Sequence, residues 1–317
     1  MITIRRAWTL LVVGLALSVP VGCGKATGEP RTAAVVEPAP VPKDAAAIAR
    51  EVVQARIGAV VRFERLRGRP VAQRIVNLGN MQAVFEGTGI DLLRDASVAF
   101  IASTGITTRD KAVVVVRHEL EDAHVQAAIE RLMARSDPPG QWLSGTSVPA
   151  ARVVVRGQQQ VLAVPSEGFL VVMPSQLADQ VDRFAGPLEL SFGDGPEAAW
   201  VVVDQPSEAL RAHRAPRIPA SISQAEFRLQ LRPDGGADLS VDGKSTSPEQ
   251  AAADAAALAR SVDAATTVKV SILRVRFFRK IPFRSEGDRV KSEVKLSPKE
   301  VNKLLTLAEV AASRSRR

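Results

Sequence analysis

Apolar and polar residues alternate along many short segments of this chain, and apolar residues recur at helical spacing along others. Alternation with a period of two is typical of strands, whereas spacing of three and four is typical of amphipathic helices. Strands are predicted over residues 59–65, 98–102, 112–117, 152–156, 160–164, 169–173, 199–203, 226–232, 237–241, 268–278 and 289–296. Helices are predicted from residue 44, over 70–85, from 122 to Pro138, and over 175–184, 207–213, 247–262 and 297–312.

Two of these helices begin with the same capping sequence. Ser247 and Ser297 are each followed directly by Pro, and Gln250 and Glu300 stand three residues after them. A serine at the N-cap, a proline at the first helical position and Gln or Glu at the third are strong helix-start signals. These two starts therefore fix the position of the last two helices along the chain.

The predicted elements follow nearly the same order in both halves of the chain, with one additional strand in the first half. Residues 186–195, rich in Gly and Pro, separate the halves. Because the strands are short and linked as hairpins, a doubly wound parallel sheet is not expected. We expect an α+β fold of two similar units, residues 44–187 and 188–317, each an antiparallel sheet with helices packed on one face. One continuous α+β domain whose elements happen to recur is the alternative.

The N-terminus has the features of an export signal. Arg5 and Arg6 precede an apolar run of about 15 residues, shorter than the roughly 20 residues of a spanning helix. The run leads to Gly22 and to Cys23, the only cysteine of the chain. Residues 18–23 (SVPVGC) resemble the lipobox of bacterial lipoprotein precursors, with Pro20 where leucine is usual. This resemblance implies removal of residues 1–22 and lipid attachment at Cys23.

Two alternatives to the lipoprotein interpretation remain: a secreted precursor cut near Ala26, and an uncleaved membrane anchor. Residues 23–43, with four prolines and no amphipathic period, are predicted to be a tether. Gly24 rather than Asp follows the cysteine. In the precursors that the segment resembles, this implies an outer-membrane location, facing the periplasm or the cell surface.

Composition and motifs argue against several kinds of chemistry. One cysteine and three histidines cannot form a disulfide framework or a thiolate zinc site. His118 and His124 lie six residues apart, which is not metal-binding helical spacing, and no phosphate loop or GxSxG motif is present. We therefore predict no catalytic, cofactor-binding or metal-binding residue and no cofactor.

Positive charge is concentrated at the C-terminus. The chain carries a net +8, residues 23–268 carry −3, and residues 269–317 carry +9. If the turn at residues 286–288 makes the last two predicted strands neighbours, their outward cations form one face that attracts anions. The candidate anion-binding residues are Arg274, Arg276, Arg279, Lys280, Arg289, Lys291 and Lys295. A solvated strand face followed by a basic terminus is the alternative.

These observations predict a non-enzymatic envelope lipoprotein that acts as a binding or assembly module. Its expected partners are the membrane, through the acyl chains, and an anionic envelope lipid or polymer or another envelope protein. Nucleic acid is not expected, because an exported protein rarely meets it. The alternatives are a carrier of an apolar ligand between sheet and helices, which needs a cavity of hundreds of cubic ångströms, and a hydrolase with a dispersed site.

The lipid anchor is directly testable. We expect Cys23→Ser to abolish acylation and to move the protein out of the membrane fraction, because each buried methylene contributes about 0.8 kcal/mol to membrane binding. Fractionation and intact-mass measurement provide the test. A variant that stays in the membrane fraction with an unchanged processing pattern would contradict the lipoprotein interpretation.

Overall fold

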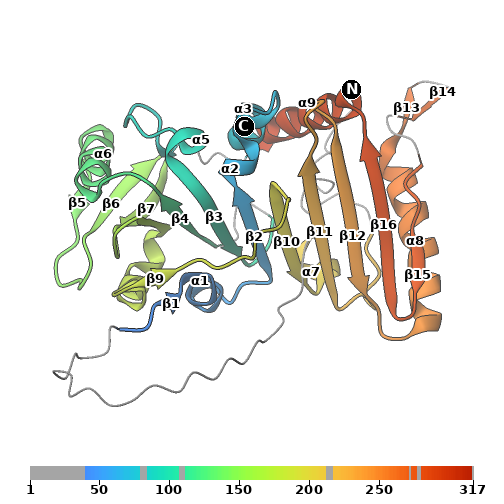
Figure 1. Cartoon of the computed structure of the whole chain (residues 1–317), viewed down its shortest axis with the longest axis horizontal. Helices are drawn as coiled ribbons and strands as arrows, with labels where there is room; N and C mark the ends of the chain where they lie inside the picture. Colours follow the sequence, from blue (N-terminus) through green and yellow to red (C-terminus); the bar gives the residue numbers. More distant parts are fainter. Residues whose placement is uncertain are drawn as a thin grey trace, which may run out of the picture.

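The computed structural model describes residues 40–78, 84–106, 111–211, 217–270, 273–276 and 280–315. The predicted signal peptide, Cys23 and most of the predicted tether lie outside these ranges. Within them, the chain forms one large sheet, with helices on both of its sides (Figure 1).

Twelve antiparallel strands form this sheet, in the order β15-β16-β12-β11-β10-β2-β3-β4-β8-β7-β6-β5. Their bounds, in that order, are Arg284–Glu286, Arg289–Leu296, Ala237–Lys244, Gln224–Leu231, Ala199–Asp204, Ile57–Arg62, Ala96–Ser103, Ala112–His118, Phe169–Pro174, Gln158–Ala163, Ala150–Val155 and Gln141–Trp142. Two small sheets join β1 (Lys43–Asp44) to β9 (Leu188–Glu189), and β13 (Thr267–Val270) to β14 (Leu273–Arg276). The predicted α+β class with an antiparallel sheet is confirmed.

The helices lie close to their predicted positions. The described helices are α1 (Ala45–Val53), α2 (Phe63–Leu66), α3 (Ala72–Leu78), α5 (Leu92–Asp95), α6 (Asp122–Arg135), the 3₁₀ helix η2 (Ser175–Phe184), α7 (Pro206–Ala209), α8 (Pro248–Thr266) and α9 (Pro298–Ser315). The capping box before α9 forms as predicted: the Ser297 N–H donates to the Glu300 carboxylate, and the Glu300 N–H donates to the Ser297 hydroxyl.

The two halves of the chain share the sheet rather than forming one each. β2, from the first half, pairs with β10, from the second, with Val61 opposite Ala199 and Ile57 opposite Val203. The predicted division into two units is therefore bridged by a full strand ladder. Whether residues 44–187 fold alone stays a prediction.

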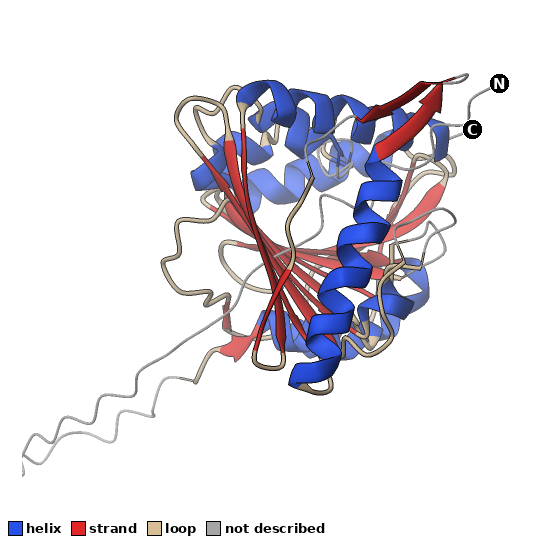
Figure 2. Ribbon diagram, turned by 90° about the vertical axis from the view of Figure 1, so that its right-hand side faces the viewer, coloured by secondary structure: helices blue, strands red, loops and turns tan. Residues whose placement is uncertain are grey.

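One face of the sheet is covered by helices along its whole length. Residues opposite one another in an antiparallel ladder project from the same face, so Val61, Ala199, Leu229, Leu239 and Val294 lie in one row. We call this the helix face. Helices α2, α3, α5, α6 and α9 pack on it in one hydrophobic cluster, and α7 and α8 pack on it in another. In Figure 2 the strands fan out with the twist of the sheet, and α8 crosses this face.

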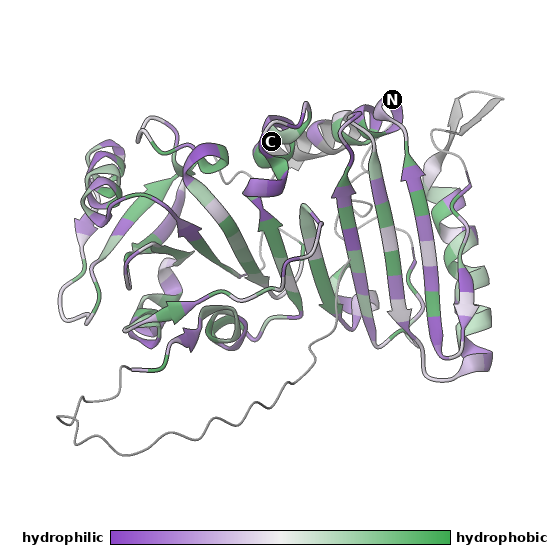
Figure 3. Ribbon diagram, in the orientation of Figure 1, coloured by the Kyte–Doolittle hydropathy of each residue, from purple (hydrophilic) through white to green (hydrophobic). Residues whose placement is uncertain are grey.

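The opposite face, which we call the split face, is covered only in the first half. There Phe100, Val115 and Val171 pack beneath α1 and η2. Farther along, the same face carries polar, partly exposed side chains such as Arg228 and Lys291. Figure 3 shows this polar and apolar alternation along β11, β12 and β16. Helices on one face, as predicted, thus describe the second half, whereas the first half is covered on both faces.

The last helix returns to the first half of the chain. Figure 1 shows α9 beside α3, and Arg74 and Glu309 join them through two parallel bonds, Nε to Oε1 at 2.7 Å and Nη2 to Oε2 at 2.8 Å. Side-chain hydrogen bonding raises the pKa of Arg74 and lowers the pKa of Glu309. This bidentate geometry is the strong form of an Arg–carboxylate pair.

A buried carboxylate anchors α8 to the loops beside the sheet. Asp254 is 1% exposed and accepts hydrogen bonds from the Ser221 hydroxyl at 2.7 Å, from the Ser245 hydroxyl and from the Gln250 amide at 2.8 Å. A buried charge is tolerated only when its hydrogen-bonding capacity is used. Asp254 meets that condition and fixes the position of α8 over the helix face.

We expect Asp254→Ala to lower the free energy of unfolding by about 1–3 kcal/mol, because three donors, of which Ser245 is buried, lose their acceptor. Asp254→Asn keeps one acceptor oxygen, so its free energy of unfolding should fall by less. The exposed Arg260→Ala on the same helix is the control, with a change within about 0.5 kcal/mol. Urea denaturation measures all three. An Asp254→Ala protein as stable as the control would show that α8 is held by apolar packing alone.

Candidate functional site

The structure does not bring the predicted anion-binding residues together. Arg274 and Arg276 belong to β14, which pairs with β13 in a separate hairpin. The strand predicted over residues 268–278 is therefore not a neighbour of β16, and that expectation was wrong. The apolar phase changes between Val270 and Leu273, where the chain reverses from β13 into β14. Arg279 lies outside the described residues.

The remaining predicted cations lie among carboxylates. Arg289, Lys291 and Lys295 project from the split face of β16, as the alternation predicted, and Lys280 is exposed in the segment before β15. Arg289 donates to Asp242 at 2.7 Å, which raises the pKa of Arg289, and Lys291 pairs with Glu286.

The next cation along β16 also faces an acidic residue. Lys295 stands opposite Asp238 in the ladder between β16 and β12. The hydrogen bond from Lys291, which has the larger effect, and the hydrogen bond from Arg284 both lower the pKa of Glu286. The open part of the split face is thus of mixed charge, and it does not form the continuous cationic surface that the sequence indicated.

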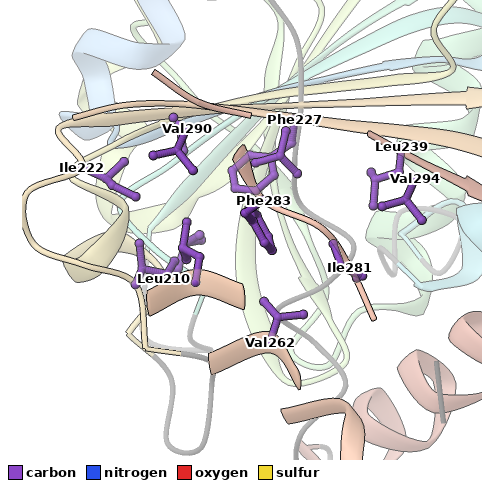
Figure 4. A pocket seen from close by; sticks show the side chains of 14 residues that line it. Leu210, Ile222, Phe227, Leu239, Val262, Ile281, Phe283, Val290 and Val294 are labelled. Atoms are coloured by element: carbon purple, nitrogen blue, oxygen red, sulfur yellow. The ribbon is translucent and has the colours of Figure 1, made fainter. Parts of the chain in front are cut away.

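An apolar cleft lies between α8 and the helix face. Its cavity volume is about 80 Å³, and none of the described residues that line it is charged (Figure 4). Phe227, Leu239 and Val290 come from the sheet, and Val262 comes from α8. In Figure 4 the side chain of Phe283, from the segment before β15, points into the same space. The volume is well below the 300–1,000 Å³ of typical ligand pockets.

A larger cavity, which we call the polar cavity, lies where β2 ends, β3 begins and β4 ends. Its volume is about 550 Å³, within the range of ligand pockets. The lining residues come from these three strand ends and from residues 190–194, in the segment that joins the two halves. They are Arg62, Glu64, Ser97, Val98, Arg117, His118, Glu119, Leu190, Ser191, Phe192, Gly193 and Asp194.

Arg62 is the most unusual residue of this cavity. It is the last residue of β2, its side chain shares the split face with Val60, and it is only 7% exposed. One guanidinium nitrogen, Nη2, donates to the Phe192 carbonyl, and the guanidinium forms no ion pair with any carboxylate in the described ranges. A buried cation without a negative partner is costly. Arg62 is also one of the residues that line the cavity.

Aromatic packing fixes the loop that supplies the Phe192 carbonyl. The Phe192 ring stacks on Phe100, with ring centroids 5.6 Å apart, and meets Trp200 edge-on at 6.0 Å. Both geometries are favourable for aromatic rings. The wall of the cavity opposite β2 is therefore held by a three-ring cluster that combines both halves of the chain.

His118 and three acidic residues complete the site. His118 is 8% exposed, and burial lowers its pKa, while Asp122 and Asp95 act in the opposite direction. Its ring is therefore neutral near pH 7. Glu64, Glu119 and Asp194 are exposed at the rim.

Sequence reasoning missed the polar cavity, although one signal was present. In β2, Gly58, Val60 and Arg62 have the same phase, so a cation stands in the buried row of an apolar strand. His118, whose spacing from His124 gave no metal-binding signal, lines this cavity. Among the described residues, no group of His, Cys, Asp and Glu side chains could hold a metal ion, and none of the described helices is long and apolar enough to cross a membrane.

Comparisons with known proteins give only distant structural likenesses. No family model matches the chain, and no curated protein matches it by sequence. Among solved structures, crystal form I of TP0453 covers 82% of this chain and 97% of its own, with 12% identity and a TM-score of 0.43. Crystal form IV gives 9% identity and a TM-score of 0.46, and form III gives 12% and 0.43. Neither function nor site residues are transferred at this level of similarity.

The burial of His118 predicts a pH-dependent contribution to stability. Its pKa is lower in the folded than in the unfolded chain, so between those values only the unfolded chain takes up the proton. The contribution of His118 to the free energy of unfolding is fully present above its pKa in the unfolded chain, about 6.5. This contribution is lost as the pH falls through its lower pKa in the folded chain.

We therefore expect the wild type to lose more unfolding free energy between pH 7.5 and pH 5.5 than His118→Gln, which cannot titrate. Urea denaturation at the two pH values measures the difference. Equal losses in both proteins would show that His118 is protonated equally well in both states.

Proposed function

We propose that this protein is an exported lipoprotein, anchored through Cys23 on the outer membrane, that acts without catalysis as a binding module of the cell envelope. The polar cavity carries this proposal. It has the volume of a ligand pocket, it holds a buried cation, Arg62, that forms no ion pair with a described carboxylate, and it lies at the join of the two halves.

The anchor and the tether are consistent with such a role. Some 20 residues between Cys23 and Lys43 give a mean reach of roughly 25 Å if they behave as a coil. The first described strand, β1, then attaches the chain to β9, close in sequence to the loop of residues 190–194. The tether thus allows the body to stand clear of the lipid headgroups while it binds another envelope component.

A carrier of an apolar ligand is the second candidate, and the apolar cleft favours it because its lining is free of charge. A volume of about 80 Å³ accommodates only a short apolar group, so α8 or the segment around Phe283 would have to move away to admit a long chain. The cleft therefore ranks below the polar cavity.

The hydrolase alternative gains little from the polar cavity. Ser97 and His118 both line it, but the Ser97 hydroxyl donates to the Arg117 carbonyl at 3.3 Å rather than to the imidazole. Nucleophilic catalysis by serine depends on contact with a base. The described side chains do not form that contact.

Photo-crosslinking in the native envelope tests the proposed binding role. A photoreactive residue at Ser191, on the cavity wall, is expected to give a discrete adduct in the membrane fraction, and the adduct should be lost when Cys23→Ser releases the protein. Gln158, exposed at the start of β7, is the matched control position. Equal labelling from both positions, or none from Ser191, would contradict a binding role for the cavity.

A further inference from the structure

We propose that the polar cavity binds a small zwitterion, an amino acid or short peptide with free termini, whose carboxylate is held by Arg62 and whose ammonium group lies at the acidic rim. This inference rests on the proposed binding function and names its class of ligand.

The anionic end of the ligand follows from Arg62. A guanidinium carries five N–H donors in a planar fork, and the Phe192 carbonyl takes up one nitrogen, Nη2. At 7% exposure, bulk water solvates the remaining charge poorly, so an anion in the cavity is the partner that offsets its burial. Arg117, exposed on β4, two strands away from β2 in the sheet, adds a second positive charge at the same cavity.

The carboxylates at the rim limit how much negative charge a ligand of this cavity can carry. Glu64, Glu119 and Asp194 bring three carboxylates to the cavity. Glu64 Oε1 lies 3.9 Å from Arg65 Nε, and Glu119 Oε1 lies 4.0 Å from Arg67 Nη2. Both distances are at the long limit of ion pairing, so much of the negative charge of the two carboxylates is available to a ligand. A dianion such as phosphate is repelled by this rim, whereas a monoanionic carboxylate also matches the guanidinium fork.

The same carboxylates favour a positive group at the mouth of the cavity, since opposite charges at short range attract and like charges repel. Val98, Leu190 and Phe192 add apolar side chains to the lining of the same cavity. A cavity of about 550 Å³ has room for an amino acid or a short peptide. Charge, lining and volume together therefore fit a zwitterion with an apolar side chain.

Calorimetric titration of the full-length protein in detergent tests the ligand class. The probes are the dipeptide alanyl-phenylalanine, its C-terminal amide, its N-acetyl derivative and inorganic phosphate. We expect saturable binding of the free dipeptide and a roughly 10- to 100-fold weaker affinity for the amide, which lacks the charge that Arg62 holds. The N-acetyl derivative is expected to bind more weakly than the free dipeptide, and phosphate is expected not to bind.

Variants separate a ligand-binding role of Arg62 from a structural one. Arg62→Met is expected to abolish dipeptide binding while leaving the protein equally stable or more stable, because it removes a buried charge that forms no ion pair with any described carboxylate. Arg183→Met is the matched control: Arg183 pairs with Glu51 outside the cavity, and its replacement should leave affinity unchanged. If Arg62→Met does not fold, Glu64→Gln combined with Glu119→Gln tests the rim. This double variant should bind the free dipeptide with lower affinity and the N-acetyl derivative with unchanged affinity.

Three results would overturn the inference: no dipeptide binding by the wild type, equal affinity for acid and amide, or full affinity in Arg62→Met. If crosslinks at Ser191 form but the dipeptide does not bind, the zwitterion assignment fails and the binding module stands. If neither crosslinking at Ser191 nor dipeptide binding is observed, both the zwitterion assignment and the proposed binding function fail.

Discussion

The antiparallel pairing of β2 with β10 is the contact on which the rest of the structure depends. It places Val61 opposite Ala199 and thereby joins strands from both halves of the chain into a single sheet. Because the ladder fixes which residues share a face, it also aligns the two hydrophobic clusters beneath the helices. At the end of the same ladder, the Arg62 backbone donates to Ala198, so the buried cation lies where the two halves meet.

The difference between the two faces explains why the described cations of β16 do not make a continuous basic surface. On β16 every second residue is buried, and three cations and Glu293 occupy the other positions. The neighbouring β12 presents Asp238 and Asp242 in the same rows, so opposite charges stand across from one another and stabilise the pairing. Net charge along the sequence therefore says little about the potential of a surface to which several strands contribute.

Local signals in the sequence predicted much of the fold. The bounds predicted for β16, residues 289–296, are those observed, because its alternation is uninterrupted, and the capping boxes positioned α8 and α9. Pairing between distant strands could not be predicted: nothing near Val61 indicates that Ala199 lies beside it. For the same reason, the polar cavity was missed. Arg62 and Phe192 are 130 residues apart, and only the phase of Arg62 within an apolar strand indicated its burial.

The contact between α3 and α9 has a consequence for the order in which the protein reaches its native state. Arg74 and Glu309 are separated by 235 residues, and closing so long a loop carries an entropic cost that must be met before the contact forms. A chain that emerges N-terminus first from a ribosome or a translocation channel exposes Arg74 long before Glu309. The native contact therefore forms only after residue 309 has followed, and until then the early helices lack their final cover.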